Sequence, residues 1–138
     1  MNLMPFLLFE GDCADAMRFY QSCLDGDLEI VLLRDTPMKD QAPEHLHDKV
    51  AYSRLTSGLV DISATDWQHQ TRTPRQGNTI GLYLTSDSFG ELEAAFGKLA
   101  VGADPDLLDE LRDMPFGAYG HLCDRFGVNW FFRGEPAP

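Results

Sequence analysis

The residues of this chain that could move a proton or hold a metal include four histidines. His45 and His47 stand two residues apart in a segment that also contains Glu44 and Asp48. An i, i+2 pair suits metal binding from a strand, but prolines interrupt this segment, and we favour two solvated histidines on an acidic loop. His69, which lies between two glutamines, is a weaker metal-ligand candidate still.

His121 is better placed, on a predicted strand shortly before a turn. As a general acid or base it would titrate in a useful pH range, although a hydrogen-bonded structural histidine is the more common case. Cys123 shares its strand face, but this spacing does not guarantee contact, so we expect no Cys–His dyad. Together with Cys13 and Cys23, and without a C-x-x-C motif, it is interpreted as a reduced thiol of a cytosolic protein.

Polar and apolar side chains alternate along residues 59–65. The apolar set is Val60, Ile62 and Ala64, and the polar set is Asp61, Ser63 and Thr65, with Asp66 at its end. This alternation predicts a strand with one face in the core. The polar face is either solvated or, in a cupped sheet, a source of hydrogen bonds to a ligand, and both interpretations stay open.

Aromatic residues supply a second candidate binding surface. Tyr52 and Tyr83 lie on predicted strands, and their rings suit either core packing or a pocket wall. Tyr119 is of the same kind. Trp67 and Phe116 lie in predicted loops near the rim, where we expect their rings to stack on a ligand.

Length and charge limit the class of protein. The 138 residues suit one compact domain, and the formal net charge of −11 without a cluster of Lys and Arg argues against nucleic-acid binding. The N-terminus lacks the pattern of a signal peptide, and no apolar run is long enough to span a bilayer. We expect a cytoplasmic protein with neither a nucleic-acid nor a membrane partner.

The periodicity of apolar residues predicts two similar halves. Strands are expected at residues 3–9, 28–34, 49–55, 59–65, 79–85, 107–111, 119–123 and 128–133, with loops at 35–48 and 66–78. One helix begins with Asp12 as N-cap, and another with the capping box Ser88 to Glu91. The order is β-α-β-β-β twice, an α+β fold whose uncovered sheet faces would form a cup.

Several short motifs recur in a characteristic order. They are Pro5–Gly11, Phe19-Tyr20, Asp48–Val50, Ser63–Asp66, Gln76–Asn78, Gly117–Gly120 and Asp124–Trp130. In this order they resemble the vicinal oxygen chelate superfamily (glyoxalases, bleomycin-resistance proteins and ring-cleaving dioxygenases), and more closely its PhnB-like branch. The resemblance implies one domain of two βαβββ modules, at about residues 1–66 and 78–133, and commonly a homodimer.

The enzymes of this superfamily hold a divalent metal with side chains from strands one, four, five and eight. The resemblance places three of these positions at Pro5, Thr79 and Phe131, and the fourth at Asp61 or Ser63. Proline and phenylalanine cannot ligate, threonine is a poor neutral ligand, and one carboxylate does not make a site. We expect a cup without a metal or another cofactor.

The resemblance leaves three functions open. The one we favour is a metal-free protein that binds a small, partly aromatic molecule, for which the acidic composition suits a cationic planar ligand. The others are a lyase or dioxygenase with displaced metal ligands, such as Asp61, His121 and a loop histidine, and a dimeric interaction module without a ligand. A methyltransferase label is also attached to this branch, but no cofactor-binding glycine motif supports it.

The expected site combines the polar and aromatic candidates. The ligand-binding set is Tyr52, Asp61, Ser63, Asp66, Trp67, Thr79, Tyr83, Phe116, Tyr119, His121 and Phe131. His121 is also the catalytic candidate. Whether the protein is an enzyme stays undecided at this stage, because fold alone does not determine function.

Overall fold

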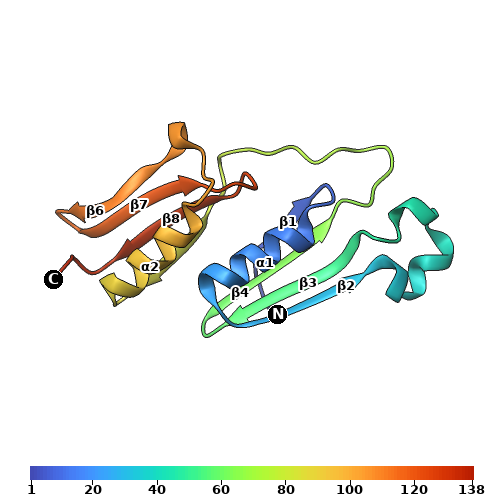
Figure 1. The fold of residues 1–138 in the computed structure, drawn as a ribbon, viewed down its shortest axis with the longest axis horizontal. Coiled ribbons are helices and arrows are strands. Elements are labelled where there is room, and N and C mark those ends of the chain that lie inside the picture. Colours follow the sequence, from blue (N-terminus) through green and yellow to red (C-terminus); the bar gives the residue numbers. More distant parts are fainter. The chain divides into compact units, whose positions relative to one another are not determined.

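The computed structural model describes residues 1–138. The chain divides into two compact units, residues 1–75 and 76–138. In each unit one helix packs on one face of a four-stranded sheet (Figure 1). The predicted order of β-α-β-β-β in each half and the α+β class are confirmed. That the two modules form a single domain stays a prediction.

The first unit is built on a mixed sheet. Its elements are β1 (Phe6–Phe9), α1 (Cys13–Leu24), β2 (Asp27–Leu32), β3 (Val50–Ser57) and β4 (Val60–Asp66). The strand order is β1-β4-β3-β2, with β1 parallel to β4 and the other pairs antiparallel. Three 3-10 turns, Leu33–Asp35, Pro37–Gln41 and Glu44–Leu46, occupy the predicted loop between β2 and β3.

The second unit repeats this topology. Its elements are β5 (Leu82–Ser86), α2 (Phe89–Leu99), β6 (Asp109–Met114), β7 (Gly117–Cys123) and β8 (Asn129–Gly134), with a 3-10 turn at Pro105–Leu107. The strand order is β5-β8-β7-β6, and β5 runs parallel to β8. Both cores consist of one helix face against one sheet face, where Tyr20 of α1 and Phe132 of β8 are fully buried. Neither helix is long and apolar enough to cross a membrane.

The predicted start of the fifth strand at residue 79 is wrong. Leu82 is the first residue of β5 to pair, and its partner Trp130 is the second residue of β8. The chain before β8 is the turn at Asp124, so the residues before Leu82 have no strand beside them to pair with. Thr79 is therefore exposed and lies outside the sheet. The first strand is also shorter than predicted, since β1 begins at Phe6.

The turn before β8 is confirmed. The Asp124 carboxylate accepts hydrogen bonds from the backbone N–H of Phe126 at 2.8 Å and of Val128 at 3.1 Å. Its second oxygen accepts one from the indole N–H of Trp130 at 2.8 Å. Gly127 supplies the positive φ of 84° that the bend needs. One buried carboxylate thus shapes the turn and fixes the largest ring of the second core.

Of the two hydrogen bonds of the predicted capping box at the start of α2, one is present. The Ser88 hydroxyl accepts a hydrogen bond from the Glu91 N–H at 3.2 Å. The Glu91 carboxylate, however, accepts from the Ser86 hydroxyl at 2.7 Å instead of reaching back to the Ser88 N–H. Ser86 takes over that task, because its hydroxyl accepts from the Ser88 N–H at 3.0 Å.

The start of α1 is stabilised in a way that the sequence did not indicate. Asp12 occupies the N-cap position, but its side chain makes no capping hydrogen bond. Asp66, at the end of β4, takes this role, since one of its oxygens accepts from the N–H of Gly11 at 2.7 Å and of Cys13 at 3.1 Å. The other oxygen accepts from the Val50 N–H at 2.8 Å. This carboxylate, 2% exposed, therefore links β4, α1 and β3.

Replacing Asp66 tests this linkage. In Asp66→Asn the amide nitrogen can accept no hydrogen bond, so at least one buried N–H is left without its partner, and the charge that favours a helix N-terminus is lost. We expect the free energy of unfolding to fall by about 3 kcal/mol, measured by urea denaturation. The partly exposed Asp61→Asn is the matched control, and we expect a clearly smaller loss, because its ion pair with Arg54 lies at the surface. Equal losses in both variants would contradict the role of Asp66.

Candidate functional site

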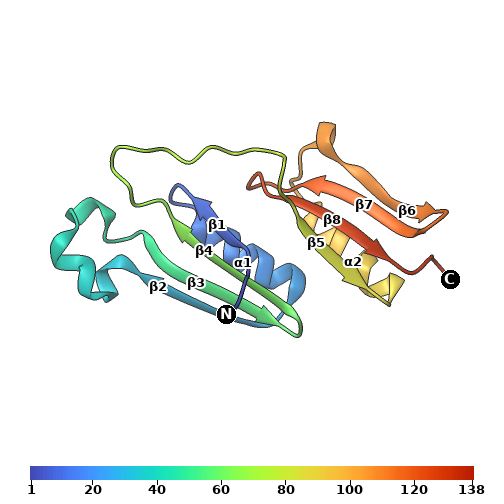
Figure 2. The same cartoon turned by 180° about the vertical axis from the view of Figure 1, so that it is seen from behind.

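Each sheet has one face against its own helix and one face without a helix, here called its helix-free face. For the second unit, Figure 2 shows the sheet with β5 in front of α2, and thus from its helix-free face. Strand register assigns side chains to these faces, because directly paired residues point to the same side of a sheet. On the first sheet the helix-free face carries Phe6, Leu8, Tyr52, Arg54, Asp61 and Ser63. On the second sheet it carries Tyr83, Thr85, Tyr119, His121, Phe131 and Arg133.

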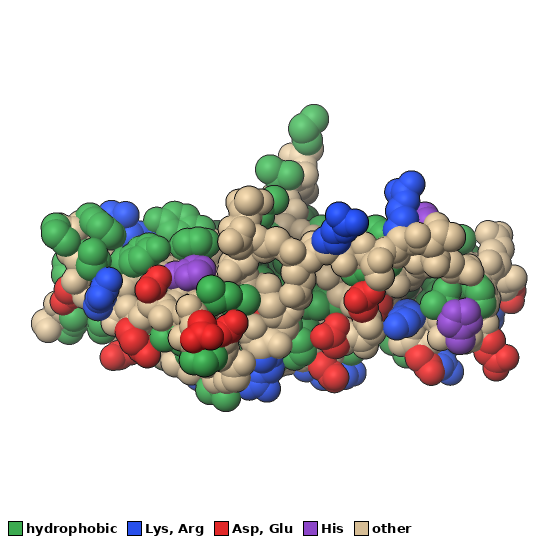
Figure 3. Space-filling view, turned by 90° about the horizontal axis from the view of Figure 1, so that it is seen from above, with side chains coloured by type: hydrophobic (Ala, Val, Ile, Leu, Met, Phe, Trp, Pro, Cys, Tyr) green, Lys and Arg blue, Asp and Glu red, His purple; other side chains and the backbone are tan.

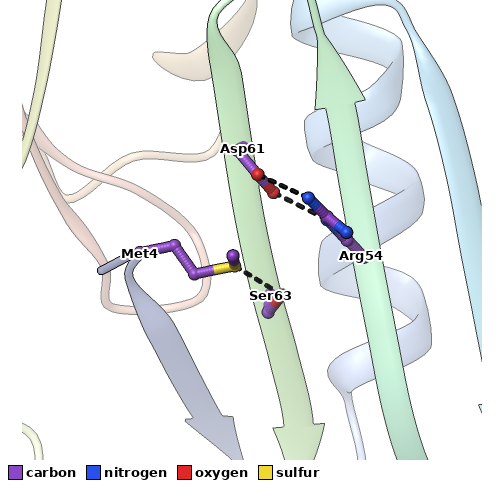
Figure 4. A network of polar contacts seen from close by, with 4 residues as sticks. All are labelled: Met4, Arg54, Asp61 and Ser63. Atoms are coloured by element: carbon purple, nitrogen blue, oxygen red, sulfur yellow. Dashed lines mark hydrogen bonds and ion pairs between the residues drawn. The ribbon is translucent and has the colours of Figure 1, made fainter. Parts of the chain in front are cut away.

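An ion pair occupies the middle of the first helix-free face. Arg54 on β3 donates two hydrogen bonds to Asp61 on β4, at 2.9 and 2.7 Å (Figure 4). These hydrogen bonds hold the pKa of Asp61 below its ordinary value. The two charges satisfy each other, so Asp61 is not a free ligand for a cation.

The other polar candidates of the first unit are also engaged. Ser63, only 6% exposed, donates its hydroxyl hydrogen to the Met4 sulfur at 3.5 Å (Figure 4). The carboxylate of Asp66 is fully used by the three backbone amides described above. We therefore remove Asp66 from the ligand-binding set. Tyr52 stays partly exposed, at 38%.

On the helix-free face of the second sheet the structure brings five predicted site residues together. His121 of β7 pairs with Phe131 of β8, and their ring centres are 4.5 Å apart. Phe131 pairs in turn with Tyr83 of β5. Tyr119 lies two residues before His121 on β7. Its ring packs edge-on against the Phe116 ring, with the ring centres 6.1 Å apart. Figure 3 shows hydrophobic side chains gathered over this unit, on the left of the view.

A pocket of about 410 Å³ opens beside this aromatic group. It is lined by Tyr83, Thr85, Ser86, Asp87, Phe116, Arg133, Gly134 and Glu135. Arg133 holds one wall, since its guanidinium carbon lies 4.4 Å from the Phe116 ring centre and one N–H donates to the Phe116 carbonyl at 3.0 Å. The sequence analysis missed Arg133, although its place two residues after Phe131 on one strand puts both on the same face.

The loop candidates of the first unit make contacts within that unit. Trp67 follows β4, donates its indole N–H to the carbonyl of Arg72 and stacks on His69, with ring centres 6.2 Å apart. His47 hydrogen-bonds through Nε2 to the carbonyls of Lys39 at 2.9 Å and Ala42 at 3.2 Å. These contacts give both side chains a local structural role.

The donor chemistry does not fit a divalent metal. Within each unit, no three His, Cys, Asp or Glu side chains group closely enough to hold one. Of the positions that the superfamily uses, Asp61 is paired with Arg54, and Phe131 packs on His121. The nearest acidic partner of His121 is Asp109, with Nδ1 3.9 Å from Oδ2, beyond hydrogen-bond reach.

The three cysteines are free thiols, and burial affects the pKa of two of them. Burial raises the pKa of Cys13 to about 12, and it also raises the pKa of Cys123. Since the thiolate is the nucleophile, neither position favours nucleophilic catalysis. Cys13 lies under the sheet, with its sulfur 3.5 Å from the Ser53 hydroxyl.

Two four-stranded βαβββ sheets define the class of protein. The architecture is shared with a glyoxylase/bleomycin resistance protein/dioxygenase domain from Frankia sp. EAN1pec, with a TM-score of 0.64 over 98% of this chain and 92% of that chain. At 15% identity this similarity shows the fold alone. The chain thus has the fold of the vicinal oxygen chelate superfamily.

Within this class the family is also shown. A family model described as 3-demethylubiquinone-9 3-methyltransferase matches residues 1–132, so the chain belongs to that family, the PhnB-like branch. Protein PA1353 from Pseudomonas aeruginosa is 29% identical over 99% of both chains, with a TM-score of 0.83. A putative 3-demethylubiquinone-9 3-methyltransferase, PhnB protein, from Bacillus cereus is 26% identical over 97% of this chain and 99% of that chain, with a TM-score of 0.72.

The raised pKa of Cys13 has a measurable consequence. The unfolded chain releases this proton near pH 9 and the folded chain retains it to about pH 12, so stability falls as the pH rises between these values. Between about pH 8 and about pH 10 the Cys13 thiol accounts for a loss of about 1.4 kcal/mol. Urea denaturation at both values should show this loss reduced by that amount in Cys13→Ala. An unchanged pH dependence in the variant would refute the assignment.

Proposed function

We propose that this protein binds a small, partly aromatic molecule without a metal, on the helix-free face of its second sheet. The observation that carries the proposal is the grouping of Tyr83, Phe116, Tyr119, His121 and Phe131 beside one pocket. A volume of about 410 Å³ lies in the range of about 300–1,000 Å³ typical of small-molecule sites.

The exposure of these rings supports a binding role. Tyr83 is 63% exposed and Phe116 is 49% exposed, although aromatic rings of this size usually gain stability from burial. Phe116 is held between the Tyr119 ring and the Arg133 guanidinium. A ring that is ordered before the ligand arrives loses little conformational entropy on binding.

Enzymatic alternatives have less support. A lyase or dioxygenase of this superfamily needs a metal, and the donor set described above does not fit one. The family description names a methyltransferase, but the only glycine between β1 and α1 is Gly11, whose N–H is bound to Asp66. We propose no methyl transfer for this chain.

Two further expectations belong to the proposal. We propose a homodimer, since β1 is paired only through β4 within its sheet and carries Phe6, 57% exposed, and Leu8, 43% exposed. We also propose that the protein works in the cytoplasm, where its three free cysteines would stay reduced.

Size-exclusion chromatography with light scattering measures the oligomeric state. We expect a dimer for the wild type and a monomer for Phe6→Glu.

A neutral planar probe tests ring binding. The probe is 2-naphthol, and we expect it to raise the thermal unfolding temperature of the wild type equally with and without EDTA. In Phe131→Ala we expect its affinity to fall about tenfold, because one face of ring contact is lost. Leu107→Ala, a half-exposed residue of the 3-10 turn before β6 and not one of the pocket-lining residues, is the control and should bind as the wild type does. Equal binding by the Phe131 variant would move the site elsewhere.

Metal content is a separate test. The purified, untagged protein is incubated with Zn²⁺, Ni²⁺, Mn²⁺ or Fe²⁺, dialysed and analysed for metal. We expect no metal at a ratio near one per chain, because the donor set does not fit a site. One metal per chain that survives dialysis would sink the metal-free proposal and make the histidines the first residues to replace.

A further inference from the structure

Two arginines flank an aromatic ring on the helix-free face of the second sheet. Arg112 of β6 pairs with Tyr119 of β7, and Tyr119 pairs with Arg133 of β8. Direct cross-strand neighbours point to the same face with Cβ atoms about 5 Å apart. Both guanidinium groups therefore stand on the face that carries the aromatic rings.

These two arginines differ from the arginine on the first sheet. Arg54 is neutralised by two hydrogen bonds to Asp61, whereas neither Arg112 nor Arg133 forms an ion pair. Asp109 also lies on this face, paired with His121, and Asp87 and Glu135 line the pocket together with Arg133. None of these carboxylates forms an ion pair with Arg112 or Arg133, so both guanidinium groups keep N–H donors for an external anion.

Arg133 is already oriented for such a partner. Its contact with the Phe116 ring and its hydrogen bond to the Phe116 carbonyl fix the plane of the guanidinium. A guanidinium has five N–H donors, and this carbonyl takes one of them. The remaining donors form the planar fork that matches a carboxylate in a bidentate way.

The aromatic side chains form a second row beside the arginines. Tyr83, Phe131 and His121 are paired across β5, β8 and β7. This row is two residues along the strands from the row of Arg112, Tyr119 and Arg133, a separation of about 7 Å. A molecule with a flat ring and an acidic group on its edge could reach both rows at once.

We propose that the ligand is a planar aromatic acid, with its ring on the Tyr83–Phe131–His121 row and its carboxylate on Arg112 and Arg133. This inference rests on the proposed function and specifies its ligand. It reverses the cationic ligand expected from the net charge of −11. A net charge sums over the whole chain, whereas a bidentate contact with a carboxylate depends on the N–H donors that point at it.

The test compares three probes of one shape and different charge, 2-naphthoate, 2-naphthamide and 2-naphthylmethylammonium, by calorimetry at one ionic strength. We expect the acid to bind about tenfold tighter than the amide, and the cation to bind most weakly. Arg112→Gln and Arg133→Gln should each lose about tenfold in affinity for the acid and keep their affinity for the amide. Lys98→Gln, which removes an exposed charge on α2, is the matched control and should change neither.

The outcomes separate this inference from the function on which it rests. If the acid and the amide bind equally, or the cation binds most tightly, the acidic ligand is refuted while ring binding stands. If none of the three probes binds, both the acidic ligand and the proposed ring-binding function are refuted. Binding of the amide that is lost in Phe131→Ala shows that the probe sits on this face. Circular dichroism spectra identical to the wild type exclude unfolding as the cause in each variant.

Discussion

The carboxylate of Asp66 is the interaction on which the first unit depends. It brings together the end of β4, the first turn of α1 and the first residue of β3 through backbone hydrogen bonds of 2.7 to 3.1 Å. Three N–H groups that would otherwise be unsatisfied near the core share one acceptor. This contact holds the first turn of α1 against the end of β4 and the start of β3.

The two units share one topology but present different chemistry. On the helix-free face of the first sheet, the charges of Arg54 and Asp61 cancel because the two side chains bind each other. On the second sheet Arg133 meets an aromatic ring and a carbonyl, neither of which carries a formal charge. The internal repeat thus keeps the backbone topology of both halves while the side chains on their helix-free faces differ.

The fold could be predicted because alternation and capping signals are local. The alternation in β4 and the Ser88 cap at α2 needed only neighbouring residues. The role of Asp66 could not be predicted, since Gly11 is 55 positions away in the sequence. The residue at which β5 begins depends likewise on where its partner β8 begins. Arg133 could be assigned to the site only once the strands beside β8 were known.

The pairing of β1 with β4 also bears on how the chain folds during synthesis. The partner of Phe6 is Ser63, so nearly the whole first unit must leave the ribosome before its first strand can be placed. Until then the apolar strand β1 has no strand to pair with. In contrast, β2 and β3 can form their antiparallel pair as soon as both have been synthesised, and β4 then joins them. The N-terminal strand, made first, is thus placed last within its unit, and chaperones would find their target there.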